Sequence, residues 1–165
     1  MKNYTYELVL PGNKNKMYLL EKFVEDISDE YNLGHTYFSN ILATLHELVT
    51  NAIVHGNKND TSKKVKILCN NNEGKLIFSI SDQGLGFDCE NITNTLDIDN
   101  FSEGNGLYIA KTLSDELSFE NNGSKVIVTF NIADANKELI SKRANVLKSS
   151  ETQKTDTKIH DENKQ

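Results

Sequence analysis

The stretch LHELVTNAIVHG, residues 45–56, decides the fold of this chain. Its apolar residues recur at helical spacing, and the same spacing reaches back to residue 35, which predicts a helix over residues 35–55 that stops at Gly56 and Asn57. At about 100° per residue the apolar side chains form one continuous core face. The edge of that face carries four polar side chains: Thr44, Glu47, Asn51 and His55. Each alone has a structural explanation as a solvated or core-edge residue.

Around this helix the sequence predicts short strands and two further helices. Alternating apolar residues predict strands, and steps of three and four predict helices. The expected elements are a strand at 4–10, a helix from Asn13 or Asn15 to about Tyr31, strands at 64–69 and 75–81, a helix at 107–113, and strands at 117–120 and 125–132. Short turns join the later strands into antiparallel hairpins. We therefore expect an α+β two-layer sandwich: a mixed, mostly antiparallel sheet with helices on one face.

The length of 165 residues fits one domain, and the apolar share of 37% suits a soluble globular protein. Residues 1–134 are expected to form this domain. Residues 135–165 are a polar extension, with a possible short helix at 135–147 followed by a disordered tail at 148–165. Residues 82–106 show no clear period, and so long an irregular segment in a compact domain is usually functional or disordered.

Charge and cysteine content exclude several classes of function. The chain has 18 basic and 24 acidic residues, a net charge of -6, and no basic stripe of the kind that binds nucleic acid. Cys69 and Cys89 share no metal-ligand spacing, and no signal sequence is recognisable at the N-terminus. No apolar run approaches the ~20 residues that span a bilayer. We expect a cytoplasmic protein with reduced thiols and no direct contact with nucleic acid or membrane.

The stretch ISDQGLGFD is expected to be a strand end followed by a ligand-binding turn. Its strand delivers Asp82 to the end of the sheet, and Gly84 and Gly86 follow at once. Glycine permits positive φ and close approach of the backbone to a ligand. The Asp82 carboxylate can accept a hydrogen bond from an amino group such as adenine N6. An ordinary Asp-x-Gly turn is the alternative interpretation.

The stretch EGNGLYIAKTLSDEL places Gly104 and Gly106 just before a helix. Free backbone N–H groups and the positive end of the helix dipole then point at one spot, which is how a helix start binds phosphate. A flexible linker that precedes a helix is the alternative. Together with the polar edge of the helix predicted over residues 35–55, the two glycine stretches predict a nucleotide site.

These stretches, in this order, resemble the motifs of the GHKL (Bergerat-fold) superfamily, which includes DNA gyrase, Hsp90, histidine kinases and MutL. ELVTNAIVHG resembles the N box, DQGLGFD the first glycine box and GNGL the second. NGSKV, residues 122–126, resembles the closing Gly-Thr motif, with Ser124 in place of Thr. The resemblance covers most of residues 35–130.

Within the superfamily the chain is most similar to bacterial anti-sigma factors that are serine/threonine kinases. The N box reads Glu-x-x-x-Asn-Ala-x-x-His, and Tyr108 follows the second glycine box, where histidine kinases usually have another glycine. The resemblance implies an ATP- and Mg²⁺-dependent kinase that sequesters a sigma factor and phosphorylates a small anti-anti-sigma (STAS-type) protein. Members of the group often form homodimers.

The resemblance also implies a role for each motif residue. Glu47 would be the general base, Asn51 would hold Mg²⁺, and His55 would bind near the phosphates or brace the helix end. Asp82 would read the adenine amino group, and Ser124 would support adenine through water or through Asp82. The remaining cofactor-binding residues are those of the two glycine boxes: Gly84, Gly86, Gly104, Gly106 and Leu107.

One residue departs from the pattern, because many members of this kinase group have Arg where this chain has Asn105. The departure keeps two other functions open. One is a non-catalytic, ATP-gated binding module in which the segment 88–103 orders around ATP. The other is an orphan histidine-kinase-type ATPase.

Overall fold

The computed structural model of the chain describes residues 6–86, 106–133 and 135. Predictions about Cys89, Gly104, Asn105, the segment 88–103 and the C-terminal extension therefore lie outside the described residues. The described residues include the N box, the closing Gly-Thr motif and parts of both glycine boxes, residues 82–86 and 106–107.

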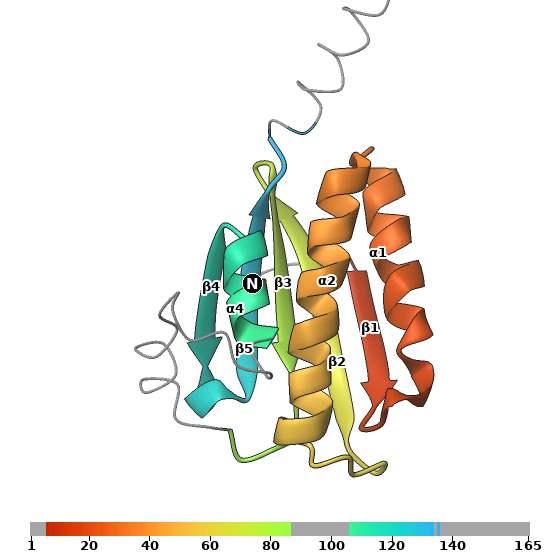
Figure 1. Cartoon of the computed structure of the whole chain (residues 1–165), viewed down its shortest axis with the longest axis vertical. Helices are drawn as coiled ribbons and strands as arrows, with labels where there is room; N and C mark the ends of the chain where they lie inside the picture. Colours follow the sequence, from red (N-terminus) through yellow and green to blue (C-terminus); the bar gives the residue numbers. More distant parts are fainter. Residues whose placement is uncertain (1–5, 87–105, 134, 136–165) are drawn as a thin grey trace, which may run out of the picture.

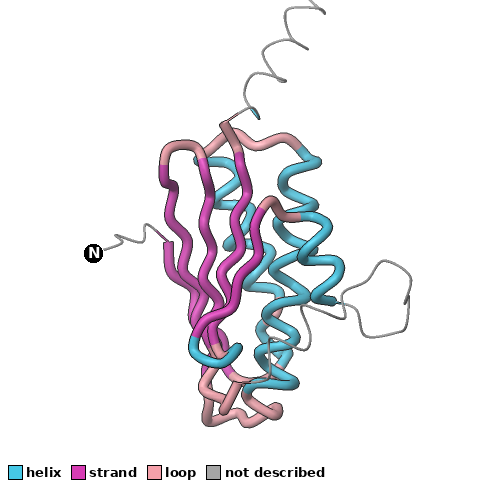
Figure 2. Tube along the Cα trace, turned by 90° about the vertical axis from the view of Figure 1, so that its left-hand side faces the viewer, coloured by secondary structure: helices cyan, strands magenta, loops and turns pink. Residues whose placement is uncertain are grey.

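The described elements form a sheet covered by helices on one face (Figure 1). In chain order they are β1 (Tyr6–Pro11), a 3₁₀ turn (Lys14–Lys16), α1 (Tyr18–Glu30), α2 (His35–Asn51), a π-helical turn (Ala52–Gly56), β2 (Lys64–Asn72), β3 (Lys75–Ser81), α4 (Gly106–Leu113), β4 (Glu116–Glu120), a 3₁₀ turn (Asn121–Gly123) and β5 (Lys125–Asn131). Seen from the side, helices and strands make two layers (Figure 2).

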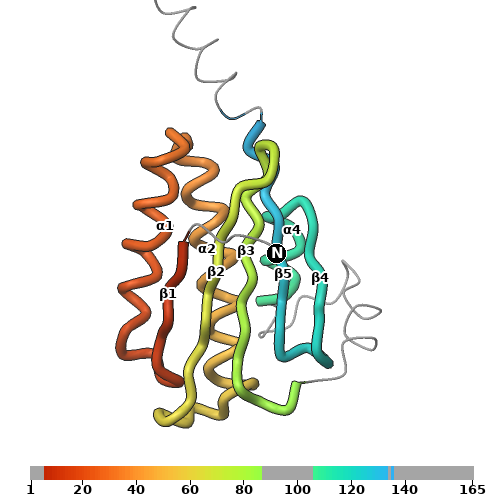
Figure 3. Tube along the Cα trace, turned by 180° about the vertical axis from the view of Figure 1, so that it is seen from behind, coloured from red at the N-terminus to blue at the C-terminus, as the bar shows by residue number. Residues whose placement is uncertain are grey.

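The strand order is β1-β2-β3-β5-β4, and each neighbouring pair is antiparallel. The described sheet is thus wholly antiparallel rather than mixed. The pairs β2–β3 and β4–β5 are hairpins, whereas longer connections that contain helices separate β1 from β2 and β3 from β5. From behind, the strands face the viewer and the described helices lie beyond them (Figure 3). The predicted α+β two-layer sandwich is confirmed.

The core lies between the sheet and the helices, and alternation along the strands builds it. On β3, Leu76, Phe78 and Ile80 are buried, as successive side chains of a strand point to opposite faces. Phe78 meets Phe130 of β5 edge to face, with ring centroids 6.0 Å apart. Such a ring pair contributes about 0.5–1.5 kcal/mol beyond its burial. No helix in the described ranges is both long and apolar enough to span a bilayer.

Several predicted boundaries were wrong, and each has a local cause. The first helix starts at Tyr18, because the Asn13 side chain accepts a hydrogen bond from Asn15 N (3.0 Å) and caps only a short 3₁₀ turn. Strand β2 runs to Asn72, three residues further than expected. The hairpin turn is only Glu73-Gly74, both with positive φ (52° and 83°), which suits the twist of two antiparallel strands.

The helix predicted over residues 35–55 keeps α-helical geometry only to Asn51. The last turn, Ala52–Gly56, is π-helical, and Asn57 N donates to Ala52 O at 2.8 Å. A π turn places more residues in each turn than an α-helix, so the 100° steps used for prediction fail there. The side chains after Asn51 therefore point in directions that the sequence pattern did not predict.

Candidate functional site

The polar edge of α2 holds two of the four residues predicted to lie there. Glu47 has a side chain 33% exposed and Asn51 is half-buried one turn later. Thr44 instead lies fully inside the core, and His55 is exposed. The prediction of one four-residue ridge is thus wrong at both ends. The π turn reorients His55. Thr44 is buried because a second element besides the sheet packs against α2.

That second element is α4, whose first residue lies directly on Glu47. A Cβ atom built on Gly106 would contact Glu47 Oε2 and lie 3.3 Å from Glu47 Cβ and Cδ. Gly106 is itself buried. The positive end of a helix dipole favours a neighbouring carboxylate. Glycine at residue 106 therefore lets the start of α4 and the Glu47 carboxylate occupy adjacent positions.

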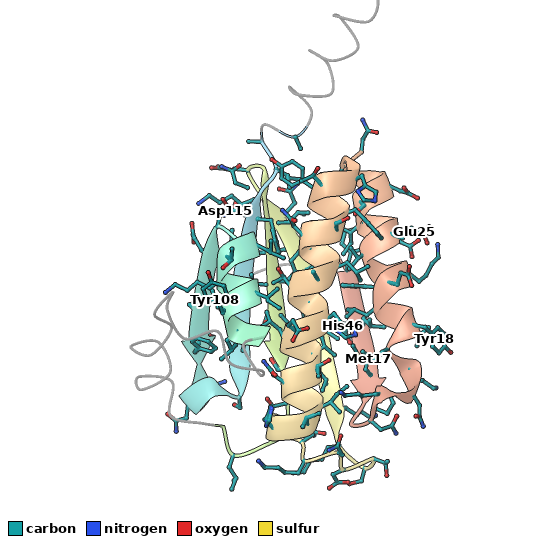
Figure 4. The ribbon with its side chains drawn as sticks, viewed as in Figure 1. Met17, Tyr18, Glu25, His46, Tyr108 and Asp115 are labelled. Carbon is teal, nitrogen blue, oxygen red and sulfur yellow. The ribbon has the colours of Figure 1, made fainter. Side chains whose placement is uncertain are left out.

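The neighbouring residue on α2, His46, points the other way. Figure 4 shows His46 on the side of α2 toward α1, whereas α4 and Tyr108 lie on the opposite side. His46 Nδ1 is 4.0 Å from Glu47 Oε1, and the His46 side chain is 57% exposed. An exposed pair at this distance contributes little, so Glu47 is positioned mainly by α4.

Asp82, just beyond β3, is anchored by the backbone on both sides. Asp82 N donates to Ser124 O (3.0 Å), and Gly84 N donates to Asp82 Oδ1 (2.7 Å). Burial raises the pKa of the Asp82 carboxyl above its usual range, while the Gly84 N–H and the Lys63 charge oppose that rise. The structure thus holds a partly buried acceptor at the end of a strand.

Three glycines, which we call the glycine cradle, let backbone segments pack closely at Asp82 and just after it. A Cβ on Gly56 would meet the Asp82 carboxyl group, at 2.6 Å from Oδ1, and a Cβ on Gly84 would meet the carbonyl oxygen of Gly56. Gly86 has φ of +79°, and its Cβ would meet Asn122 O. The end of α2, the segment after β3 and the turn at 121–123 therefore pack backbone to backbone. Gly84 and Gly86 were expected in this site; the contact of Gly56 with Asp82 was missed.

Of the remaining predicted residues, Ser124 lies beside Asp82, and Leu107 lies on α4. Ser124 donates its hydroxyl hydrogen to Asn121 O (2.9 Å), and it reaches Asp82 through its own carbonyl group. Its support of a bound base stays a prediction. Leu107, the second residue of α4, packs against the core.

Two residues that the sequence analysis did not assign to the site also converge there. Asn57, expected only as a helix stop, is fully buried and joined by hydrogen bonds to Gln83 and Lys64. Gln83 lies between Asp82 and Gly84 and bonds to Lys64 in turn. No spacing rule connects residues 57 and 83, so only the fold reveals the pair.

Comparison with known proteins defines the class. The sequence profile of the histidine kinase-like ATPase domain matches residues 10–130, more than half of the chain. The chain therefore belongs to this family, and the GHKL-type assignment made from the motifs is confirmed.

Among individual relatives, the serine-protein kinase RsbW of Bacillus subtilis (strain 168) is 30% identical over 105 residues. The match spans 58% of this chain and 66% of that protein, just under two thirds of its length. The solved RsbU and RsbW domains of a Mycobacterium tuberculosis protein align with a TM-score of 0.50 and 16% identity, over 76% of this chain and 32% of that one. A blue-light activated histidine kinase domain from Erythrobacter litoralis aligns with a TM-score of 0.49 and 17% identity, over 78% of this chain and 64% of that one. The alignment with the mycobacterial domains supports the fold.

The chemistry of the site fits a purine nucleotide bound with Mg²⁺. The glycines let backbone segments pack closely around Asp82, whose partly buried carboxyl group can accept a hydrogen bond. Within the described ranges no cluster of three His, Cys, Asp or Glu residues could hold a metal. Mg²⁺ prefers oxygen ligands and usually keeps several waters. The Asn51 amide oxygen with the phosphates would therefore suffice as its ligands.

Proposed function

We propose that this protein is an ATP- and Mg²⁺-dependent serine/threonine protein kinase of the anti-sigma type. It would phosphorylate a small anti-anti-sigma (STAS-type) protein and sequester a sigma factor. The observation that carries the proposal is Glu47, which lies one helical turn before Asn51 and directly under the first residue of α4. The identity with RsbW over 105 residues supports it.

The binding roles follow the motif order. Asp82 accepts from the adenine amino group in the cradle of Gly56, Gly84 and Gly86. Asn51 would hold the Mg²⁺ that neutralises phosphate charge. Ser124 supports the base, His55 braces the helix end or binds near the phosphates, and the second glycine box contacts the phosphates: Gly104, Gly106 and Leu107.

Glu47 is suited to act as the general base. Its carboxylate would accept the proton of a substrate serine or threonine hydroxyl as that oxygen attacks the γ-phosphorus. The bond to the bridging oxygen of the leaving ADP breaks in the same displacement. Positioning and charge neutralisation dominate phosphoryl transfer, and one carboxylate orients the nucleophile. A side chain that is 33% exposed can be reached by a protein substrate.

The test is phosphate transfer with Mg²⁺ and ATP to small antagonist proteins encoded by neighbouring genes. Glu47→Ala should abolish transfer and leave ATP binding intact. His46→Ala is the matched control, because His46 is the adjacent residue and lies on the α1 side of the helix. Transfer by Glu47→Ala at the wild-type rate would refute the base role.

A second candidate is a non-catalytic ATP-gated binding module, and Asn105 in the second glycine box favours it. Here ATP would bind and partner affinity would depend on nucleotide, but no phosphoprotein would form. An orphan histidine-kinase-type ATPase would instead leave acid-labile phosphate on a partner. The same transfer assay, followed by acid treatment of the product, separates all three.

A further inference from the structure

Three separate segments are tied together beside the nucleotide site by Asn57 and Gln83. Asn57 Oδ1 accepts from Gln83 N (2.8 Å), and Asn57 Nδ2 donates to Lys64 O (3.0 Å). Gln83 Oε1 accepts from Lys64 N (2.7 Å). These three bonds close a ring that joins the end of α2, the start of β2 and the segment after β3. We call this ring the amide clamp.

The chemistry of the amide clamp is more specific than ordinary packing. Asn57 is fully buried, and both ends of its amide are engaged by backbone groups. A buried amide left without partners is destabilising, so its orientation is fixed by these bonds. Gln83 is exposed and contributes nothing to the core, yet its side chain is ordered onto Lys64. Ordering an exposed side chain opposes folding, so this contact needs a reason.

The amide clamp acts on Asp82 through the backbone. Asp82 N is bonded to Ser124 on one side, and the next N–H, that of Gln83, is bonded to Asn57 on the other. Two consecutive N–H groups held in this way fix the peptide plane from which the Asp82 side chain extends. The residue before Asn57 is Gly56, whose missing Cβ leaves room for the Asp82 carboxyl group. Asn57 thus positions the backbone at Asp82 through Gln83, and it positions Gly56, the residue that contacts the Asp82 carboxyl group.

We propose that Asn57 and Gln83 are positioning residues that set the purine selectivity of this site. The inference rests on the proposed role of Asp82 as acceptor for the adenine amino group. A carboxylate held in place accepts from a 6-amino group and opposes a 6-keto oxygen, because two acceptors then face each other. Sites built to hydrogen-bond one substrate group discriminate strongly against analogues that lack it. Without the amide clamp Asp82 moves, and selectivity falls while phosphate contacts persist.

The experiment measures dissociation constants of the full chain for Mg-ATP and for Mg-purine riboside triphosphate, which lacks the 6-amino group. Wild type should prefer ATP by about tenfold to a hundredfold, the effect of one hydrogen bond to a charged group. Gln83→Ala and Asn57→Ala should reduce this ratio by about threefold or more through weaker ATP binding, with the analogue unaffected. Gln83→Glu keeps an acceptor for Lys64 N and should retain the ratio. Lys58→Ala, at an exposed residue beside Asn57, is the control.

Each other outcome overturns the proposal. Equal loss of affinity for both nucleotides would show that the pair only supports the fold, and unchanged affinities would show that it does not act on Asp82. Gln83 is exposed, so Gln83→Ala carries the test even where Asn57→Ala fails to fold. A wild-type protein that does not distinguish the nucleotides, with Asp82→Asn binding ATP equally well, would instead refute the proposed role of Asp82. Phosphate transfer is not needed for any of these readings.

Discussion

Replacing Gly106 by alanine tests whether α4 holds the Glu47 carboxylate, the proposed general base, in place. The new methyl group would make too close a contact with Glu47 Oε2 and would lie 3.3 Å from Glu47 Cβ and Cδ. Glu47 is half-buried and lies on a well-packed helix, so its side chain rather than the helix should yield. The carboxylate then swings out toward solvent.

Two effects on stability oppose each other in this variant. Alanine in place of glycine stabilises a helix interior by about 1 kcal/mol, which is an upper bound at the first residue of α4. Forcing a side chain off its preferred rotamer costs about 0.5–1.5 kcal/mol. The net change in the free energy of unfolding should therefore stay within about 1 kcal/mol. A displacement of about 1 Å at a catalytic group, in contrast, lowers the rate by about 10²-fold.

The assay compares phosphate transfer, ATP affinity and urea unfolding for wild type, Gly106→Ala and Gly34→Ala. Gly34 is the matched control, because nothing lies within 4 Å of a Cβ built on it. Gly106→Ala should lose about 10²-fold in single-turnover transfer while ATP affinity stays within about threefold. Alanine keeps the backbone N–H of residue 106 that would contact phosphate, and a displaced base acts on the transition state alone. Gly34→Ala should behave as wild type in both measurements.

Two results would contradict this reasoning. Transfer at the wild-type rate would show that the contact with Gly106 does not place Glu47 for chemistry. Loss of ATP affinity in proportion to the loss of transfer would show that Gly106 acts chiefly on the phosphates.

Three further predictions follow from buried groups. Because burial raises the pKa of Asp82, this carboxyl group should be protonated, and lose its acceptor function, at a higher pH than an ordinary aspartate; the preference for ATP over purine riboside triphosphate should decline in that pH range. Protonation also relieves the cost of burying the charge, so the wild-type free energy of unfolding should rise as pH falls through this range. Asp82→Asn should lack this rise. Thr44→Val should stabilise by about 1–2 kcal/mol in urea titrations without changing ATP affinity, since the fully buried hydroxyl oxygen has no partner among the described residues; destabilisation would reveal one. Burial raises the pKa of Cys69 to about 12, so in a Cys89→Ser background its thiol should resist a disulfide reagent until urea unfolds the protein, and rapid labelling of the folded protein would contradict its burial.

The sequence predicted the elements that carry the motifs because each is marked locally. Helical spacing defined α2, alternation defined β3, and Gly84 and Gly86 marked the segment that follows β3. Thr44 shows the limit of this approach. A helical wheel describes burial against one face, whereas α4 covers a second face of α2, and a polar residue at the predicted edge therefore becomes fully buried. Contacts between residues far apart in sequence, such as Asn57 with Gln83, leave no local mark.

The π turn at Ala52–Gly56 explains how the two halves of the site are joined. In a continuous α-helix His55 would follow Glu47 and Asn51 along one edge, as the sequence pattern predicted. The wider turn instead exposes His55 and brings the next two residues inward: Gly56 against the Asp82 carboxyl group, and Asn57 onto Gln83. π turns inside helices occur frequently at functional sites. The α-helical part of this helix thus carries the proposed general base, Glu47, and the proposed metal ligand, Asn51. Its π turn positions Asp82, the proposed acceptor for adenine. The distance between the proposed sites of phosphate transfer and adenine recognition is therefore set within α2 and its last turn.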